Sequence, residues 1–362
     1  MPTQHPSSTG IPSIGLEQIQ LLEKLSNACG VSGDEGEVRK IVLEQIQDCA
    51  DEITIDSMGN VLAVRKSKMQ DPLRVMIAAH MDEIGFMLVK DDGNCQFQFE
   101  IVGGIDPRQV VGKTVWVGKE HIPGVIGSRP IHLTDSEERK RAVSILDLRI
   151  DLGVRNDKNI EPGDRAAFAT KFFQNRSSLF GKALDDRIGV ATLIELLKHA
   201  PPNIELLAAF TVQEEVGLRG ALVAAYSLKP DMAIALDSTP ANDMPAWDGN
   251  ENTRYNARLG EGPAIYIADR STISDPRIID HFVKSAKENH IPYQFRQAGG
   301  GSTDAGSIHR QREGIPSLSV SVPGRYAHTT TMLVRLEDWQ NTFKLIYSGL
   351  SDISPELFKT PR

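Results

Sequence analysis

The stretch RVMIAAHMDEIGF, residues 74–86, decides the fold class. Residues 75–79 are all apolar, and a short apolar run of this kind is typical of a strand buried on both faces. The run ends in polar residues, with His80, Asp82 and Glu83 in close succession. In open α/β sheets, ligands bind at the carboxyl ends of such strands. We therefore expect an α/β fold with a functional site at the end of this strand.

Helical and strand patterns alternate on both sides of this stretch. Apolar residues recur at helical spacing in residues 16–28 and 35–47, and residues 60–66 have a strand pattern. After residue 178, helical patterns alternate with apolar strand patterns, the helices at 185–200, 220–228, 275–290 and 337–350 and the strands at 204–214, 232–237 and 317–322. This alternation indicates a layered α/β domain built on a mixed sheet.

The pattern changes between residues 85 and 175. Short β-rich stretches dominate there, broken by Gly and Pro, at residues 84–90, 95–104, 113–118 and 166–173. We expect residues 85–175 to form a small inserted β-barrel-like domain with a role in oligomerisation. Residues 1–84 and 176–362 are then the two parts of one discontinuous catalytic domain.

Composition excludes several classes of partner. The chain has 362 residues, enough for two domains of ordinary size, and its net charge is −8 without a long basic run, so nucleic acid is not expected as a partner. No stretch approaches the roughly 20 apolar residues of a membrane span. The three cysteines are scattered without CxxC spacing, which favours a reducing, cytoplasmic compartment.

Carboxylates and imidazoles follow several of the predicted strands or open the helix after residue 181. They are His80, Asp82, Asp185, Asp186, Glu214, Glu215, Asp237 and His328. Stacked carboxylates repel one another unless a cation neutralises them, so a metal explains the set economically. Imidazole and carboxylate without cysteine suit Zn²⁺, Co²⁺ or Mn²⁺, and the surplus of carboxylates suggests two ions that share a bridging ligand.

Six motifs carry a resemblance to a known family. They are AHMDEIGF (79–86), GKALDDRIG (181–189), VQEEVGLRG (212–220), ALDSTP (235–240), GGGSTDAG (299–306) and VPGRYAH (322–328). In this order they resemble the co-catalytic metallo-aminopeptidases of metallopeptidase family forty-two. That family includes tetrahedral and glutamyl aminopeptidases and proteins once labelled endoglucanases. The resemblance spans residues 17–350 and implies a zinc-peptidase-like catalytic fold.

The resemblance implies a ligand set for two divalent metal ions per subunit. Asp185 would bridge the two ions. His80 and Asp237 would complete the shell of one ion, and Glu215 and His328 would complete that of the other.

The resemblance also implies two catalytic carboxylates outside the ligand set. Glu214 would be the general base that takes a proton from the attacking water, and Asp82 would orient the His80 imidazole. A cis peptide bond would join Asp185 to Asp186. Two simpler interpretations stay open: the two aspartates could merely cap a helix, and Glu214 with its neighbour could be a solvated strand end.

The function implied is a metal-dependent aminopeptidase that hydrolyses N-terminal residues from peptides through a metal-activated water. The alternatives are a carbohydrate hydrolase of the endoglucanase type, which needs two carboxyls and no dinuclear metal, and a catalytically inactive scaffold. The resemblance further implies that the inserts pair subunits into homodimers, which assemble into a tetrahedral dodecamer with its active sites facing inward.

Overall fold

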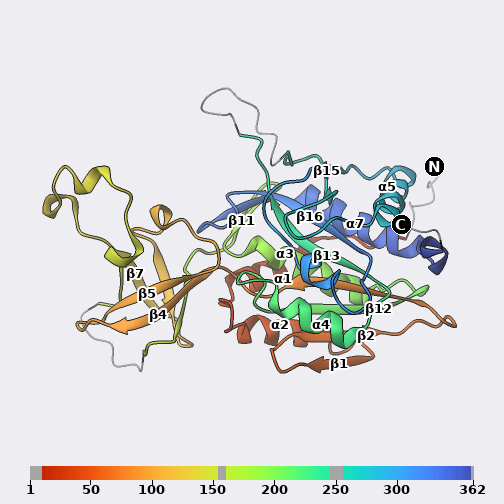
Figure 1. Ribbon diagram of the computed structural model, residues 1–362, viewed down its shortest axis with the longest axis horizontal. Helices are drawn as coiled ribbons and strands as arrows, with labels where there is room; N and C mark the ends of the chain where they lie inside the picture. The colour runs from red at the N-terminus through yellow and green to blue at the C-terminus, as the bar shows by residue number, and fades with distance from the viewer. Residues whose placement is uncertain (1–9, 154–159, 245–255, 360–362) are drawn as a thin grey trace, which may run out of the picture.

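The computed structural model describes residues 10–153, 160–244 and 256–359. Figure 1 shows a large α/β body from which a smaller β-barrel projects on one side. This is the fold class expected from the sequence, a layered mixed-sheet domain with an inserted barrel, and that expectation is confirmed. None of the described helices is long and apolar enough to cross a membrane.

The helices of the described residues are short to medium in length. The α-helices are α1 (Leu16–Asn27), α2 (Gly36–Ile46), α3 (Leu184–Lys198), α4 (Arg219–Leu228), α5 (Pro276–Glu288), α6 (Ala305–Ile308) and α7 (Leu336–Asp352). The 3₁₀ turns are η1 (Pro107–Gln109), η2 (Ile131–Leu133), η3 (Glu138–Lys140), η4 (Ile145–Asp147) and η5 (Pro355–Phe358).

One mixed sheet forms the base of the large domain. Its strands are β1 (Glu52–Ile55), β2 (Val61–Arg65), β3 (Leu73–His80), β10 (Phe173–Asn175), β11 (Ser178–Gly181), β12 (Ile204–Thr211), β13 (Met232–Pro240), β14 (Ala264–Tyr266), β15 (Gln294–Arg296), β16 (Ser317–Arg325) and β17 (Met332–Arg335). The order is β1-β2-β12-β3-β13-β16-β17-β11-β10, with β14 paired to β16 and β15 paired to β14. The four central strands β12, β3, β13 and β16 run parallel, so their carboxyl ends meet at one edge.

Strand β3 is central because both of its faces are apolar. Val75 and Ile77 pack into the core that contains α1, α2, α3, α5 and α7, whereas Met76 and Ala78 pack against α4 and α6 on the opposite face. The sheet therefore lies between two helical layers. The register places His80, the last residue of β3, beside Thr211, the last residue of β12.

The barrel has its own core. It is closed in the order β4 (Gly85–Asp91), β5 (Gln96–Val102), β8 (Arg149–Asp151), β7 (Ile122–Gly127), β6 (Thr114–Val117) and β9 (Arg165–Phe168). Phe86 packs edge-on against Phe99 and Phe168, with ring centroids 5.1 and 5.2 Å apart. These aromatic rings fill the interior of the small closed barrel.

The β-rich stretch expected at residues 166–173 ends earlier than the sequence indicates. Strand β9 stops at Phe168, and the Phe172 N–H donates to the Asn27 side chain instead of to a neighbouring strand. The Phe172 ring packs into the core of the large domain. Strand β10, also within residues 85–175, pairs with β11 and extends the large sheet.

Candidate metal centre

The predicted site residues gather at the edge where the central parallel strands end. They are His80 at the end of β3 and Asp82 just beyond it, Glu214 and Glu215 after β12, Asp237 within β13, His328 after β16, and Asp185 at the start of α3. Parallel pairing brings these ends together, which is why residues up to 248 positions apart in sequence share one site.

The Asp185 carboxylate lies between the two imidazoles. Its Oδ1 is 3.3 Å from His80 Nε2, and its Oδ2 is 3.6 Å from His328 Nε2. Burial raises the pKa of Asp185, but the hydrogen bond with His80 and the attraction of the His80 and His328 imidazoles together lower it to about 2. Asp185 is therefore ionised at neutral pH and presents one oxygen to each side of the site.

Asp186 serves a different purpose from its neighbour. Its Oδ1 accepts the Gly189 N–H of α3 at 3.0 Å, and its Oδ2 accepts the His80 N–H at 3.3 Å. The side chain thus caps the regular part of α3, which begins after the non-helical Asp185 and Asp186. The peptide bond between the two aspartates is cis, as the resemblance implied.

Each imidazole is oriented by a backbone carbonyl. His80 Nδ1 lies 3.2 Å from the Asp82 carbonyl oxygen, and His328 Nδ1 lies 2.9 Å from the Gly104 carbonyl oxygen. With a proton on Nδ1 to donate, each ring could present its Nε2 lone pair to a cation that displaced the Nε2 proton. Both Nε2 atoms face the carboxylates, which is the arrangement that metal-binding histidines adopt.

Two groups of donor atoms meet at the site, and Asp185 belongs to one of them. His80, Asp186 and Asp237 can offer one ligand atom each within 4.8 Å of one another, and so can Asp185, Glu215 and His328. His80 Nε2 is 3.8 Å from Asp237 Oδ1, and His328 Nε2 is 3.8 Å from Glu215 Oε2. The site therefore has room for a cation on either side of Asp185.

The carboxylates of the site repel one another. Burial raises the pKa of Asp237 well above its usual value, and repulsion from Asp185 and Asp186 adds to this shift. Burial also raises the pKa of Glu215 to about 7, although the His328 imidazole acts in the opposite direction. A divalent cation would relieve this repulsion, so the donor set fits a metal centre.

Asp82 is fully buried and holds several groups in place. Its Oδ2 accepts the Ser32 hydroxyl at 2.6 Å and the Glu215 N–H at 3.1 Å, while its Oδ1 accepts the Glu214 N–H at 3.0 Å. Its Oδ1 also lies 3.5 Å from His80 Nδ1. Asp82 thus links β3 to the loop after β12 that carries both glutamates.

Glu214 differs from Asp82 because its carboxylate is uncommitted. Within the described ranges, no protein group donates a hydrogen bond to its side chain. Burial raises its pKa well above the usual value; attraction to His80 opposes this shift, and repulsion from Glu215 and Asp304 adds to it. An uncommitted carboxylate with a raised pKa is suited to accept and release a proton.

Comparison with known proteins assigns the chain to a family. The M42 glutamyl aminopeptidase family matches residues 59–345. The chain belongs to this family. It is 37% identical over 339 residues to a putative aminopeptidase of Acetivibrio thermocellus, covering 92% of this chain and 98% of that protein. It is 30% identical to the glutamyl aminopeptidase of Lactococcus lactis, covering 94% and 98%.

Solved structures of M42 relatives share the whole fold. A TET aminopeptidase from the marine sediment archaeon Thaumarchaeota archaeon SCGC AB-539-E09 matches with a TM-score of 0.90 and 32% identity, covering 95% of this chain and 98% of that one. The TET1 peptidase of Pyrococcus horikoshii, which can assemble into a tetrahedron or a large octahedral shell, matches with a TM-score of 0.82 and 31% identity, covering 93% and 100%.

The protein is therefore an M42 aminopeptidase, a hydrolase that acts on peptide N-termini. The family assignment favours this activity over the carbohydrate hydrolase and the inactive scaffold considered on the sequence alone.

Sequence analysis missed a buried ion cluster behind the M42 site. Lys182 Nζ donates to both Glu83 oxygens at 2.7 and 2.9 Å, and Arg187 Nη2 lies 3.3 Å from Glu83 Oε1. The Gly30 N–H donates to the same oxygen at 3.0 Å. All three charged residues lie within the recognised motifs, Glu83 in AHMDEIGF and Lys182 and Arg187 in GKALDDRIG, so their position was a signal that could have found them.

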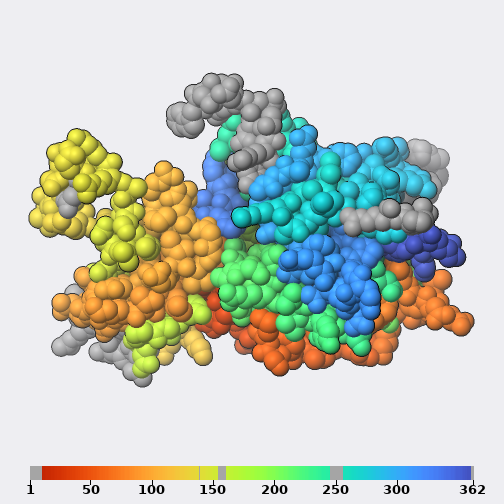
Figure 2. All heavy atoms as spheres, in the orientation of Figure 1, coloured from red at the N-terminus to blue at the C-terminus, as the bar shows by residue number. Residues whose placement is uncertain are grey.

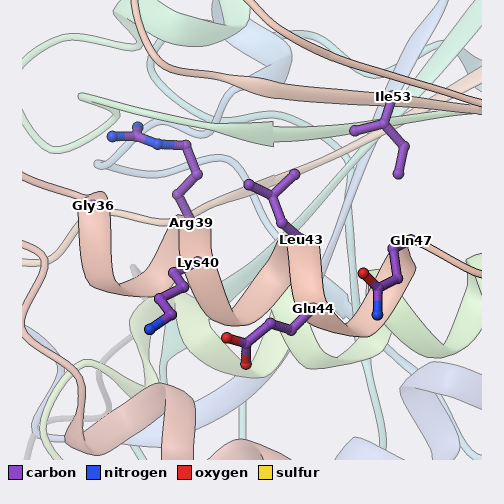
Figure 3. Close-up of a pocket in the computed structure, with 7 residues that line it drawn as sticks. All are labelled: Gly36, Arg39, Lys40, Leu43, Glu44, Gln47 and Ile53. Atoms are coloured by element: carbon purple, nitrogen blue, oxygen red, sulfur yellow. The ribbon is translucent and has the colours of Figure 1, made fainter.

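Two surface hollows differ in their relation to the site. One, of about 460 Å³, is lined by Tyr326 and residues 329–331, on both sides of His328 in the chain, and by Arg108 and Lys113 near the barrel. The other, of about 330 Å³, lies over α2 against Ile53 of β1, and none of the predicted site residues lines it (Figure 3). None of the predicted site residues lines the first hollow either, although its lining residues stand next to His328 in the chain.

Proposed function

We propose that this M42 aminopeptidase works with two divalent cations, and that Asp185 bridges them. The single observation that carries the proposal is the position of the Asp185 carboxylate, with one oxygen 3.3 Å from His80 and the other 3.6 Å from His328. A carboxylate that bridged two cations would have to present one oxygen to each side in this way.

The remaining ligands divide between the two sides of Asp185. His80 and Asp237 would hold one cation, and Glu215 and His328 would hold the other. Zn²⁺ or Co²⁺ suits this mixture of imidazole and carboxylate, and Mn²⁺ is also compatible with it. When bound, such cations make a water nucleophilic near neutral pH and polarise the scissile carbonyl.

Glu214 is the general base of the proposal. Its carboxylate takes a proton from the attacking water and delivers it to the leaving amine of the peptide. The uncommitted carboxylate and its raised pKa support this role. Asp82 acts indirectly, because it orients His80 and holds the backbone of Glu214 and Glu215 in place.

The barrel is proposed to pair subunits into dimers that assemble into a tetrahedral dodecamer. The proposed insert is residues 85–175, except that Phe172 and β10 pack with the large domain, and residues 1–84 and 176–362 are the catalytic domain. Figure 2 shows a yellow segment that stands out from the end of the barrel, and it contains η2 and η4. Ile131, Leu133 and Leu146 in this segment are 60–73% exposed. Exposed apolar side chains on a projecting element support an interface with a second copy.

Peptides with a free N-terminus are the proposed substrates, and the cytoplasm is the proposed location. All three cysteines are free thiols, which supports a reducing compartment. Enclosure in a hollow particle would admit unfolded peptides and exclude folded proteins.

Metal analysis of two variants tests the bridge. Asp185→Ala should hold two fewer ions per chain than the parent protein and lose activity on aminoacyl anilides, because both cations lose a shared ligand. Asp186→Asn is the matched control: it should keep both ions, because Asp186 already binds two backbone N–H groups, and its cost should be stability. If only Asp186→Asn lost the ions, the bridge would have to move to Asp186.

A further inference from the structure

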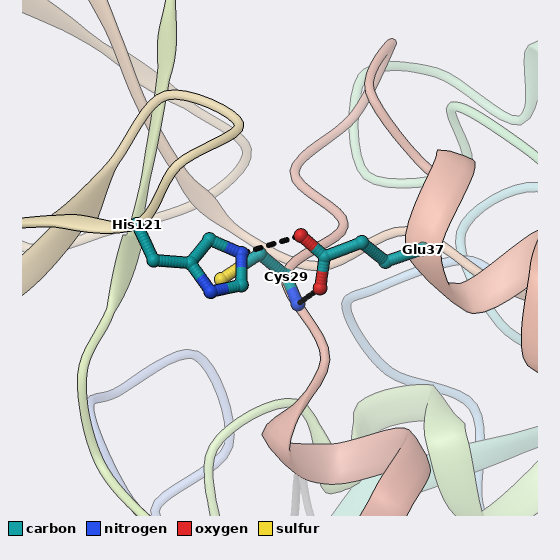
Figure 4. Close-up of side chains that lie close together, drawn as sticks. All are labelled: Cys29, Glu37 and His121. Atoms are coloured by element: carbon teal, nitrogen blue, oxygen red, sulfur yellow. Dashed lines mark hydrogen bonds and ion pairs between the residues drawn. The ribbon is translucent and has the colours of Figure 1, made fainter. Parts of the chain in front are cut away.

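A second set of metal-ligating side chains lies away from the candidate centre. Cys29, Glu37 and His121 come together where the barrel meets the large domain (Figure 4). Each offers one ligand atom, a thiol Sγ, a carboxylate oxygen or a ring nitrogen, and these atoms lie within 4.8 Å of one another. Thiolate, imidazole and carboxylate together are a ligand set that Zn²⁺ uses in proteins.

The three side chains come from two separate bodies of the molecule. Cys29 follows the end of α1, Glu37 lies in the first turn of α2, and His121 lies in the turn between β6 and β7 of the barrel. His121 has a φ of 51°, the left-handed region that non-glycine residues seldom adopt. From this turn the imidazole reaches across the junction to Glu37 of the large domain.

Glu37 lies between the other two residues. One of its oxygens accepts the Cys29 N–H at 3.0 Å, and the other makes a short hydrogen bond with His121 Nε2. The carboxylate is thereby oriented with the thiol and the imidazole on neighbouring sides. Figure 4 shows the Cys29 side chain directed toward the His121 ring.

A cation could reach this position from solvent. A hollow of about 370 Å³ opens at the junction and is lined by Cys29 and Glu37, with Trp116 and Arg165 on the barrel side. The His121 and Glu37 side chains are 38% and 40% exposed. Three protein ligands would leave a coordination position for water.

The simpler alternative is that Glu37 and His121 form an ordinary ion pair and Cys29 is a bystander. Burial raises the pKa of the Cys29 thiol to about 11, so the thiol is neutral in that case. A cation that binds here must displace the thiol proton, and a thiophilic ion such as Zn²⁺ or Co²⁺ can do so, whereas Mg²⁺ and Ca²⁺ prefer oxygen ligands.

We propose that Cys29, Glu37 and His121 form a separate binding site for a thiophilic divalent cation that joins the barrel to the large domain. Because one ligand comes from the barrel and two come from the large domain, a bound ion would hold the β6–β7 turn against α2. The site is structural and stands independently of the two cations proposed at Asp185.

Cobalt absorption spectroscopy on the whole protein tests this proposal. Co²⁺ coordinated by a thiolate has a charge-transfer band in the near ultraviolet, and no cysteine belongs to the proposed active-site ligands. The metal-free parent, kept reduced with a phosphine, should develop this band on titration with Co²⁺. Cys29→Ser should abolish the band, and the control Cys95→Ser should retain it.

His121→Asn gives a second test that does not depend on the cysteine variant folding well. Asn tolerates the left-handed backbone at this position, so the turn should be preserved. Its Co²⁺ affinity, followed by the same band, should fall at least about tenfold. Zn²⁺ should also raise the melting temperature of the parent more than that of His121→Asn. Absence of the band in the parent at saturating Co²⁺, or its persistence in Cys29→Ser, would overturn the proposal.

Discussion

Adjacent acidic residues in this protein differ in what their carboxylate oxygens already bind, and this difference gives them different roles. Both oxygens of Asp186 accept backbone N–H groups, whereas those of Asp185 face two imidazoles. In the same way, the buried Asp82 is engaged by three donors and Glu214 by none among the described residues. Residue type alone cannot make this distinction, because it depends on which hydrogen bonds the fold supplies.

The first prediction concerns Glu214. Glu214→Gln should retain the active-site cations and lose about 10²- to 10⁴-fold in kcat, because it removes the proposed base and leaves the ligands. Steady-state kinetics and metal analysis of the same preparation would measure both effects. Glu205→Gln on β12 is the control, since it removes only a partly exposed pair with Arg74 and should leave kcat within a few-fold. A small effect at Glu214 would shift the role of base to Asp82.

At the scale of elements, the sequence predicts the features that depend on the pattern of neighbouring residues along the chain. The apolar run of β3 and its polar end are both visible at residues 74–83, and the same holds for β12 and β13. Parallel strands then bring His80, Glu215 and Asp237 to one edge without further information. For this reason the candidate site was predictable even though its geometry was not.

Contacts between segments distant in sequence were not predictable in the same way. Ser32 donates to Asp82, and the Gly104 carbonyl accepts from His328, but no spacing rule connects these pairs. The early end of β9 also has a non-local cause, because Asn27 of α1 takes the Phe172 N–H. Such features depend on how helices, strands and loops pack against one another. A single sequence does not show this packing.

The second prediction concerns the loop after β5. A Cβ at Gly104 would lie 3.0 Å from His328 Nδ1, so Gly104→Ala should displace this imidazole. We expect metal affinity to fall roughly tenfold, the usual effect of disturbing the partner of a ligand. Competition with a chromogenic chelator would measure it. Gly127→Ala in β7 is the control, because its Cβ would meet nothing nearer than 3.9 Å. Equal affinities in the two variants would contradict the proposed role of the loop.

The third prediction concerns the cluster that ties α1, β3 and α3 together. Lys182→Met removes a buried cation from Glu83 and should lower the free energy of unfolding by about 3–5 kcal/mol. Urea denaturation would measure this change. Lys66→Met breaks an exposed pair with Glu52 instead, and it should leave the free energy of unfolding almost unchanged. Similar costs for the two variants would show that the buried cluster contributes no more than a surface pair.

For the whole molecule, the junction between the barrel and the large domain contributes more to the site than the six motifs suggest. The barrel carries none of the six motifs beyond their flanks, yet Gly103 and Gly104 follow β5 and reach the site. A Cβ at Gly103 would lie 3.3 Å from Glu215 Oε2. The loop after β5 therefore bears on the catalytic edge through Glu215 and His328. A change in how the barrel sits would reach that edge through this loop.

The fourth prediction concerns assembly. Light scattering of metal-loaded protein should give about twelve chains, and metal-stripped protein should give dimers, since closed symmetric assemblies are the common form of homo-oligomers. Leu146→Asp, at a side chain 73% exposed on the projecting barrel segment, should reduce the mass. Leu222→Asp on α4, 45% exposed on the large domain, should leave it unchanged. Because enclosure limits substrates to peptides that pass the openings, the assembled enzyme should cleave short peptides and spare folded proteins. A metal-loaded monomer that trims folded proteins from their N-termini would refute both the role given to the barrel and the enclosure.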